Sequence, residues 1–151
     1  MIRPMTHNDL PVVMALAALM HRESPRFNGY KFDAHKVAQL LRQAVENPDI
    51  YCALVSSVDF VVVGGFLGTA YSQWFSDDRV AADLALFVQP DKRGGIAAMR
   101  LIKAYEAWAK DLGVKTITLG VSTGVHHDRT IRLYETLGFE EPSIALQKRL
   151  S

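Results

Sequence analysis

Apolar residues recur at every third or fourth position in three stretches of the chain, which predicts three helices that each bury one face. These stretches are residues 10–20, 37–45 and 98–112. Asp33 is a suitable N-cap for the second helix, and Gly113 is a suitable terminal glycine for the third. A shorter helix is predicted from Asp128 to Leu137.

Strands are predicted where Val, Ile, Tyr, Phe and Leu are dense and turn residues bound the segment. They cover residues 1–3, 50–57, 60–71, 81–88 and 115–121, followed by a closing pair around Phe139 and from Ile144 to Leu150. Gly64, Gly65 and Gly68 predict a bulge or a close backbone approach in the third strand. The order β-α-α-β-β-β-α-β-α-β-β is typical of an α/β (α+β) fold, a mixed sheet with helices on both faces.

Composition limits the kinds of protein that this chain can be. A length of 151 residues with 49% apolar residues predicts one domain, residues 1–151. The 17 basic and 16 acidic side chains nearly cancel, so nucleic acid is not an expected partner. Residues 10–20 are too short to span a bilayer, so no membrane contact is expected either. The single cysteine, Cys52, excludes an internal disulfide and favours a cytoplasmic location, while a homodimer is left open.

A basic glycine turn joins the strand at residues 81–88 to the helix that follows. Lys92 and Arg93 precede Gly94 and Gly95, so two cations and the free N–H groups of a helix start meet in one place. Such an arrangement binds phosphate or pyrophosphate. The alternative is an ordinary strand-to-helix turn, in which the glycines supply backbone freedom and the cations are solvated.

The segment from Glu23 to Phe32 interrupts the helical pattern, yet it carries three aromatic residues. Together with the turn from Gln73 to Arg79, it is expected to line a substrate site. The candidate contacts are Glu23, Phe27, Tyr30 and Trp74. The alternative is that these aromatic side chains close the edge of a core.

A second motif, Leu133-Tyr-Glu-Thr-Leu-Gly-Phe139, lies some forty residues after the glycine turn. Together with Val88-Gln-Pro-Asp-Lys-Arg-Gly94 it resembles the GCN5-related N-acetyltransferase (GNAT) superfamily. That family pairs a Val-x-Pro-x-x-Arg-Gly loop with a Leu-Tyr-x-x-x-Gly-Phe segment, and the element order here is similar too. Two departures are Lys92, where the family has Gln or Arg, and His127, where it usually has Asn.

The resemblance implies transfer of an acetyl group from acetyl-CoA, the expected co-substrate, to an amine, with no metal. It places the pantetheine arm of coenzyme A between two splayed parallel strands, near residues 86–88 and 119–121, where the arm bonds to a strand edge. The residues that it implies for coenzyme A binding are Phe87, Val88, Lys92, Arg93, Gly94, Gly95, Ile96, Ala97, His127 and Arg129.

Tyr134 is the catalytic acid that the resemblance implies, because a phenol is protonated at neutral pH. The alternative is a tyrosine that only packs in the core. Asp83 is the candidate base, with Glu23, His126, His127 or a water chain as alternatives. Two adjacent histidines without a third clustered ligand do not predict a metal site.

Two other classes of protein stay open. One is a non-catalytic acyl-CoA-binding or sensor domain of the same fold. The other is a small nucleotide- or flavin-binding protein, against which the irregular element order before residue 80 argues. The acceptor is expected to be a small-molecule amine or a peptide terminus, and the residue pattern decides neither its identity nor whether the acyl group is longer than acetyl.

Overall fold

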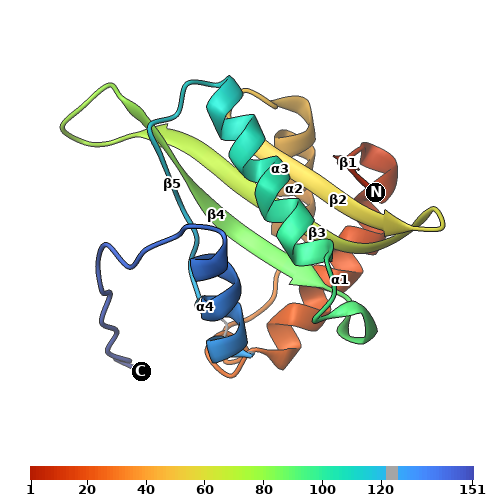
Figure 1. The fold of residues 1–151 in the computed structure, drawn as a ribbon. Coiled ribbons are helices and arrows are strands. Elements are labelled where there is room, and N and C mark those ends of the chain that lie inside the picture. The colour runs from red at the N-terminus through yellow and green to blue at the C-terminus, as the bar shows by residue number, and fades with distance from the viewer. Residues whose placement is uncertain (122–125) are drawn as a thin grey trace.

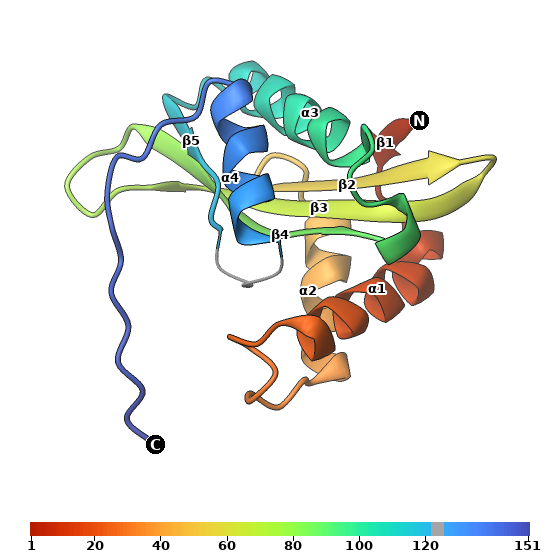
Figure 2. The same cartoon turned by 60° about the horizontal axis from the view of Figure 1, so that its bottom comes forward.

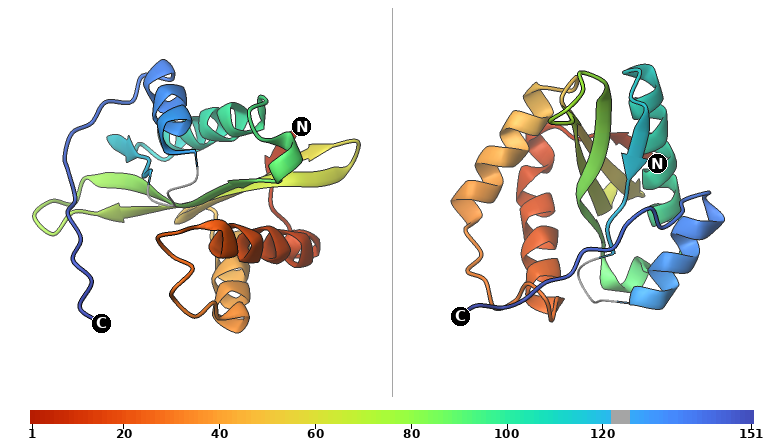
Figure 3. Two further views of the ribbon diagram at one scale, coloured as in Figure 1. Left: turned by 90° about the horizontal axis from the view of Figure 1, so that it is seen from below. Right: turned by 90° about the vertical axis from the view of Figure 1, so that its left-hand side faces the viewer.

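A central sheet separates two layers of helices in the computed structural model, which describes residues 1–121 and 126–151 (Figure 1). The helices are α1 (Leu10–Glu23), α2 (Ala34–Glu46), α3 (Ala97–Asp111) and α4 (His127–Thr136). The strands are β1 (Ile2–Pro4), β2 (Tyr51–Val58), β3 (Val61–Ser72), β4 (Arg79–Val88) and β5 (Thr116–Thr118). Helices α1 and α2 cover one face, and α3 and α4 lie on the other (Figures 2 and 3). The predicted α/β class with helices on both faces is confirmed.

Within the described residues, the sheet has the strand order β1-β2-β3-β4-β5. The first four strands pair antiparallel, whereas β5 runs parallel to β4. Helix α3 makes the connection between β4 and β5, as a parallel pair requires. The glycine turn lies in this connection, between the end of β4 at Val88 and the start of α3 at Ala97.

The closing pair of strands predicted around Phe139 and from Ile144 to Leu150 is not formed. Residues 137–151, all of them described, contain no strand. Pro142 interrupts the series of backbone donors, and the side chains of Ile144, Leu146 and Leu150 are exposed. An alternating pattern holds a strand on a sheet only if one of its faces is buried, and here neither face is.

Two apolar cores hold the helices on the sheet. Below α1 and α2, the buried residues include Val13, Leu41, Val55, Leu67 and Phe87. Below α3, they include Cys52, Phe66, Ala81, Leu101 and Tyr105. Phe66 and Leu67 are neighbours on β3 and enter opposite cores, as the alternation of side chains along a strand dictates. Burial raises the pKa of the Cys52 thiol to about 12, so this cysteine is an inert core residue.

The irregularity that the glycines of β3 predict is confirmed at Gly68. Leu67 pairs with Ala85, but Gly68 pairs with Asp83, so Leu84 is an extra residue in β4. A Cβ atom on Gly68 would lie 2.9 Å from the ring of Phe66, which leaves room for glycine alone. Such a bulge bends its strand and increases the local twist.

The first strand is fastened to α1 by an ion pair. The two terminal guanidinium nitrogens of Arg3, Nη1 and Nη2, donate to the carboxylate of Asp9 at 2.7 and 2.8 Å, and the backbone N–H of Thr6 donates to the same carboxylate at 2.8 Å. These bonds lower the pKa of Asp9 to about 2.

None of the helices in the described ranges has the length and apolar character needed to cross a membrane.

Replacing Asp9 by Asn is expected to lower the free energy of unfolding by about 2 kcal/mol at neutral pH. Because the folded-state pKa of about 2 lies below the ordinary 3.8, this contribution is complete above that ordinary value and is lost as the pH falls toward 2. Urea unfolding over a series of pH values measures it. Asp77→Asn, at an exposed turn, is the control, and a difference between wild type and Asp9→Asn that is equal at every pH would contradict the expectation.

Candidate active site

The candidate site begins where β4 and β5 separate. Their pairing covers Val80 with Thr116, Ala81 with Ile117, and Ala82 with Thr118, and goes no further. The next residue of β4, Asp83, accepts a hydrogen bond from the backbone N–H of Gly120 at 2.9 Å. Together with the bulge at Leu84, this side-chain contact replaces the backbone ladder and leaves the edge of β4 beyond it without a strand partner among the described residues.

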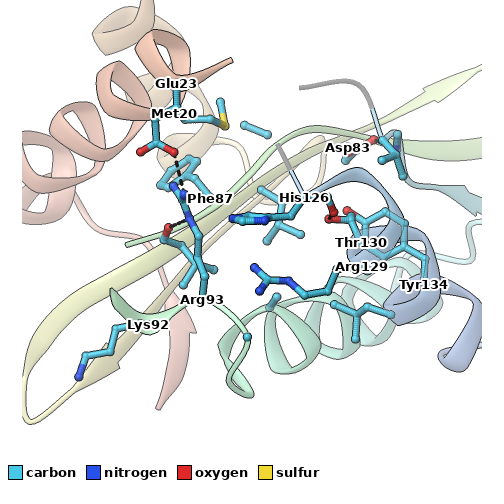
Figure 4. A pocket seen from close by; sticks show the side chains of 18 of the residues that line it. Met20, Glu23, Asp83, Phe87, Lys92, Arg93, His126, Arg129, Thr130 and Tyr134 are labelled. Atoms are coloured by element: carbon cyan, nitrogen blue, oxygen red, sulfur yellow. Dashed lines mark hydrogen bonds and ion pairs between the residues drawn. The ribbon is translucent and has the colours of Figure 1, made fainter. Parts of the chain in front are cut away.

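A cavity of about 380 Å³ lies at this separation (Figure 4). Its walls come from the end of α1, from β4 after the bulge, from the glycine turn and from α4. A volume of this size is in the range of small-molecule sites. Eleven residues predicted for the site line it: Glu23, Phe27, Asp83, Phe87, Val88, Lys92, Arg93, Gly94, Gly95, Arg129 and Tyr134.

The glycine turn and α4 together form a candidate anion site. Gly94 has a φ of +83°, a conformation that L residues rarely adopt, and α3 begins three residues later at Ala97. The first N–H groups of a helix have no partner within that helix. From α4, the guanidinium of Arg129 comes within 3.6 Å of the position that a Cβ atom on Gly94 would occupy. Helix donors and a cation therefore converge on one space.

The two cations of the turn itself, Lys92 and Arg93, make different contacts from Arg129. Arg93 donates through Nη1 to Glu23 at 2.6 Å and through Nε to the carbonyl of Val88 at 2.9 Å. Both charged side chains of the pair are largely buried, with 20% and 26% of their surface exposed. The ammonium group of Lys92 points away from Arg93 and Arg129 (Figure 4). Arg93 thus joins the turn to the end of α1, and Arg129 is the cation over Gly94.

Tyr134 reaches the cavity from α4 and is buried, with 6% of its surface exposed. Its ring packs against Phe139 at a centroid distance of 6.1 Å. Burial, and after it the charge of Asp83, raises the pKa of the Tyr134 phenol above its usual value near 10. Burial also raises the pKa of Asp83, although the N–H of Gly120 acts in the opposite direction. The two groups that the sequence proposed as acid and base therefore line one cavity.

Five of the predicted site residues do not line this cavity. Tyr30 lines a neighbouring cavity between α1 and α2. Ile96 is the N-cap of α3, Ala97 is the first residue of that helix, and His127 is the first residue of α4. Trp74 is 94% exposed on the β3–β4 turn, where it packs edge-on against Phe75 and lines neither cavity.

The alternative base His126 does line the cavity, from a left-handed backbone position with a φ of 49°. Its carbonyl accepts hydrogen bonds from the backbone N–H and the hydroxyl of Thr130, both at 3.0 Å. The rest of the loop predicted before α4, residues 122–125, lies outside the described residues. In the described part of the chain, no group of three or more His, Cys, Asp and Glu side chains is arranged to hold a metal ion.

Sequence reasoning missed the ion pair between Glu23 and Arg93. The two residues are 70 positions apart, and neither has a charge pattern around it that marks a partner. It also missed Met20, Thr130 and Leu133 as lining residues. Thr130 is, however, four residues before Tyr134, and Leu133 is four residues after Arg129. Residues at that spacing lie one helical turn apart on the same face, a signal that could have identified both.

The chain matches the acetyltransferase (GNAT) family over residues 16–139, and it belongs to that family. One of the similar solved structures is an aminoglycoside acetyltransferase, meta-AAC0020, from an uncultured soil metagenomic sample. It is 21% identical and has a TM-score of 0.75, with 100% of this chain and 96% of that chain covered. No curated protein sequence matches the chain.

Two further structures show the same fold. A ribosomal-protein-alanine N-acetyltransferase from Brucella melitensis is 20% identical, with a TM-score of 0.75 over 100% of this chain and 99% of that one. AAC(6')-Iy, in complex with a bisubstrate analogue of CoA, is 22% identical, with a TM-score of 0.74 over 100% of this chain and 97% of that one. At these identities the similarity establishes the fold.

A double-mutant cycle of Glu23→Gln and Arg93→Gln is expected to give a coupling energy of about 1–2 kcal/mol in the free energy of unfolding, because the pair is largely buried. The matched control is the Glu106–Lys110 pair, whose side chains are 40% and 74% exposed. It should give about 0.3–0.5 kcal/mol. Chemical unfolding of the seven proteins, the wild type and three variants for each pair, measures both values, and equal coupling in the two pairs would contradict the structural role of the buried pair.

Proposed function

We propose that the protein transfers an acetyl group from acetyl-CoA to the amino group of a small molecule. The observation that carries the proposal is the separation of β4 from β5, which opens into a cavity that contains both Tyr134 and the glycine turn before α3. Membership of the GNAT family supports the same reaction class. Fold alone does not determine function, so the argument rests on what the cavity residues can do.

The residues present fit coenzyme A. Pyrophosphate needs convergent donors and positive charge, and the start of α3 supplies N–H groups while Arg129 supplies a cation. A side chain at Gly94 would enter the space below Arg129, and the positive φ of Gly94 disfavours one there. The backbone edge of β4 beyond the bulge suits the amide-bearing pantetheine arm, which can bond to it as an added strand would.

When bound, acetyl-CoA supplies a thioester, whose C–S bond breaks as the amine nitrogen forms a C–N bond with the carbonyl carbon. Two proton movements balance this exchange: the nitrogen loses a proton and the sulfur gains one. Tyr134 is proposed to donate to the sulfur, because its raised pKa keeps the phenol protonated throughout the neutral range. The same burial makes a departing thiolate more basic and so favours its protonation.

Asp83 is proposed to take the proton from the amine. Burial raises its pKa above the ordinary value of an aspartate, which makes it a stronger base than an exposed aspartate. Glu23 is less suited to this role because Arg93 holds its carboxylate at 2.6 Å. His126 lines the cavity as well and is the alternative base.

The acceptor is proposed to be a small amine. Three of the similar structures, from two proteins, are named as aminoglycoside acetyltransferases and one as a ribosomal-protein-alanine N-acetyltransferase, so the fold accommodates both small and protein acceptors. The loop after α1 lines both cavities near β4, whose volumes of about 380 and 410 Å³ are in the range of small-molecule sites and suit a small amine better than an extended peptide.

Arg129→Ala is expected to weaken acetyl-CoA binding by about tenfold to a hundredfold and to reduce its salt dependence, because a hydrogen-bonded charge is lost from the phosphates. Lys92→Ala should have a smaller effect, since that ammonium group points away from Arg129 (Figure 4). Calorimetry at low and high salt measures both.

Arg132→Ala is the matched control, because Arg132 is exposed on the same helix and lines neither cavity. Unchanged affinity in Arg129→Ala would remove this residue from the anion site.

Tyr134→Phe is expected to lower kcat by roughly 10²-fold with little change in acetyl-CoA affinity, because only the proton donor is removed. Thiol release in the presence of an amine measures kcat, and calorimetry measures affinity.

The control is Tyr105→Phe, which removes a hydroxyl from another buried tyrosine, outside the cavity. Tyr105→Phe should keep its turnover. Wild-type turnover in Tyr134→Phe would mean that another group protonates the sulfur, and a wild-type protein that binds acetyl-CoA but acetylates no amine would indicate the non-catalytic alternative.

A further inference from the structure

A second cavity, of about 410 Å³, adjoins the one described above. It lies between α1, α2, the loop that joins them, and β4. Five residues line both cavities: Met20, Phe27, Leu84, Ala85 and Phe87. Because Leu84 is the bulged residue of β4, the second cavity meets the first at the point where β4 turns away from β5. We call it the α1–α2 cavity.

The walls of the α1–α2 cavity are mainly apolar. They include Val13, Ala17, Val37, Leu40, Leu41 and Phe32. An apolar wall stabilises a ligand in proportion to the apolar surface that the ligand buries there. This cavity is therefore suited to a hydrocarbon or aromatic body.

The charged groups around the α1–α2 cavity do not suit a polycation. Lys31 and Lys36 face it together with one carboxylate, that of Asp33. Asp33 already accepts a hydrogen bond from the backbone N–H of Lys36 at 3.1 Å and caps α2. In the adjoining cavity, Glu23 is held by Arg93. A ligand with several ammonium groups would meet more positive than negative charge on this side.

His21 adds a single polar group to this apolar surrounding. Its Nε2 atom is shielded from solvent and has no hydrogen-bond partner among the described residues. The imidazole ring packs against Phe32 at a centroid distance of 5.3 Å and lines the cavity. A buried nitrogen without a partner is costly, and a ligand that supplies the missing hydrogen bond removes that cost. A hydroxyl group suits either tautomer of the imidazole, since it can both donate and accept.

We propose that the α1–α2 cavity binds the body of the acetyl acceptor, and that this acceptor is a primary monoamine with an aromatic or branched apolar body that carries a hydroxyl group. The amino group lies in the first cavity near Asp83, the apolar body lies in the α1–α2 cavity, and the hydroxyl group bonds to His21. This inference rests on the proposed function for the identity of the reaction, but the binding site can be tested without it.

Three amines serve as probes: tyramine, phenethylamine, which lacks only the hydroxyl group, and spermidine, which is a polycation. Calorimetry on the full chain, without acetyl-CoA, measures binding directly. Tyramine is expected to bind about fivefold more tightly than phenethylamine, the worth of one hydrogen bond. Spermidine is expected to bind at least about tenfold more weakly than tyramine. Acetylation of the same amines should follow the same order.

Two variants locate the bound body. His21→Phe keeps a ring against Phe32 and removes the nitrogen, so it should abolish the preference for tyramine over phenethylamine. Ala17→Phe fills the cavity and should weaken the binding of both tyramine and phenethylamine by about tenfold or more. Ala18→Phe is the matched control, because it adds the same side chain to the next residue of α1, which lines neither cavity. Thermal unfolding verifies that each variant is folded.

The outcomes separate this inference from the proposed function. Tyramine binding that depends on His21 and Ala17, without acetyl transfer, would support the binding site and count against the proposed reaction. Acetylation of spermidine in preference to tyramine would support the reaction and overturn the inference. A ratio of tyramine to phenethylamine affinity that is unchanged in His21→Phe, or equal losses in Ala17→Phe and Ala18→Phe, would also overturn it.

Discussion

The backbone of β4 stops pairing with β5 after Ala82, and the cavity of the candidate site opens at that break. Backbone N–H and C=O groups that leave a ladder need other partners. Asp83 supplies one through Gly120, and the bulge at Leu84 directs the rest of the strand away from β5. The strand edge that results is ready to bond an extended ligand. Helix α4, which follows β5, then brings Tyr134 and Arg129 to the same opening.

The ion pair of Arg93 with Glu23 connects the two sides of the site. Arg93 belongs to the turn before α3, and Glu23 is the last residue of α1, so the pair ties the proposed coenzyme side to the helix that borders the acceptor side. Arg93 also holds the carbonyl of Val88, at the end of β4. One guanidinium group therefore fastens the end of α1 both to the end of β4 and to the turn that follows it. Its planar fork of donors allows several bonds at fixed angles.

The fold and the choice of acceptor depend on different features of the chain. Structures about one-fifth identical to this one share its fold with TM-scores near 0.75. A backbone can be shared at such low identity because ladders, a bulge and helix starts depend on main-chain groups and on a few glycines. Side chains such as His21 and Phe27, by contrast, line the cavity that we propose for the acceptor. For this reason the family identifies the reaction class but not the amine.

Local patterns in the sequence determined much of this protein. The helices, the first five strands and the glycine turn each follow from residues close together in the chain, because apolar spacing and capping act within a few positions. The placement of Tyr134 beside the turn came from the resemblance of two motifs to a family, and the structure puts both motifs on one cavity. The predicted bulge near Gly68 was local as well.

Tertiary structure alone decided the conformation of the C-terminal segment and the contacts between residues far apart in the chain. The segment after Thr136 has an alternating pattern, but it forms no strand because no buried face receives it. Three features depend on which surfaces contact one another, and residues far apart in the chain determine those contacts. They are the partner of Arg93, the exposure of Trp74, and the buried nitrogen of His21, which has no hydrogen-bond partner within the described residues. A one-dimensional pattern shows that a face is to be buried. It does not show which other surface will cover that face, because packing and strand register are fixed only when all the elements are assembled.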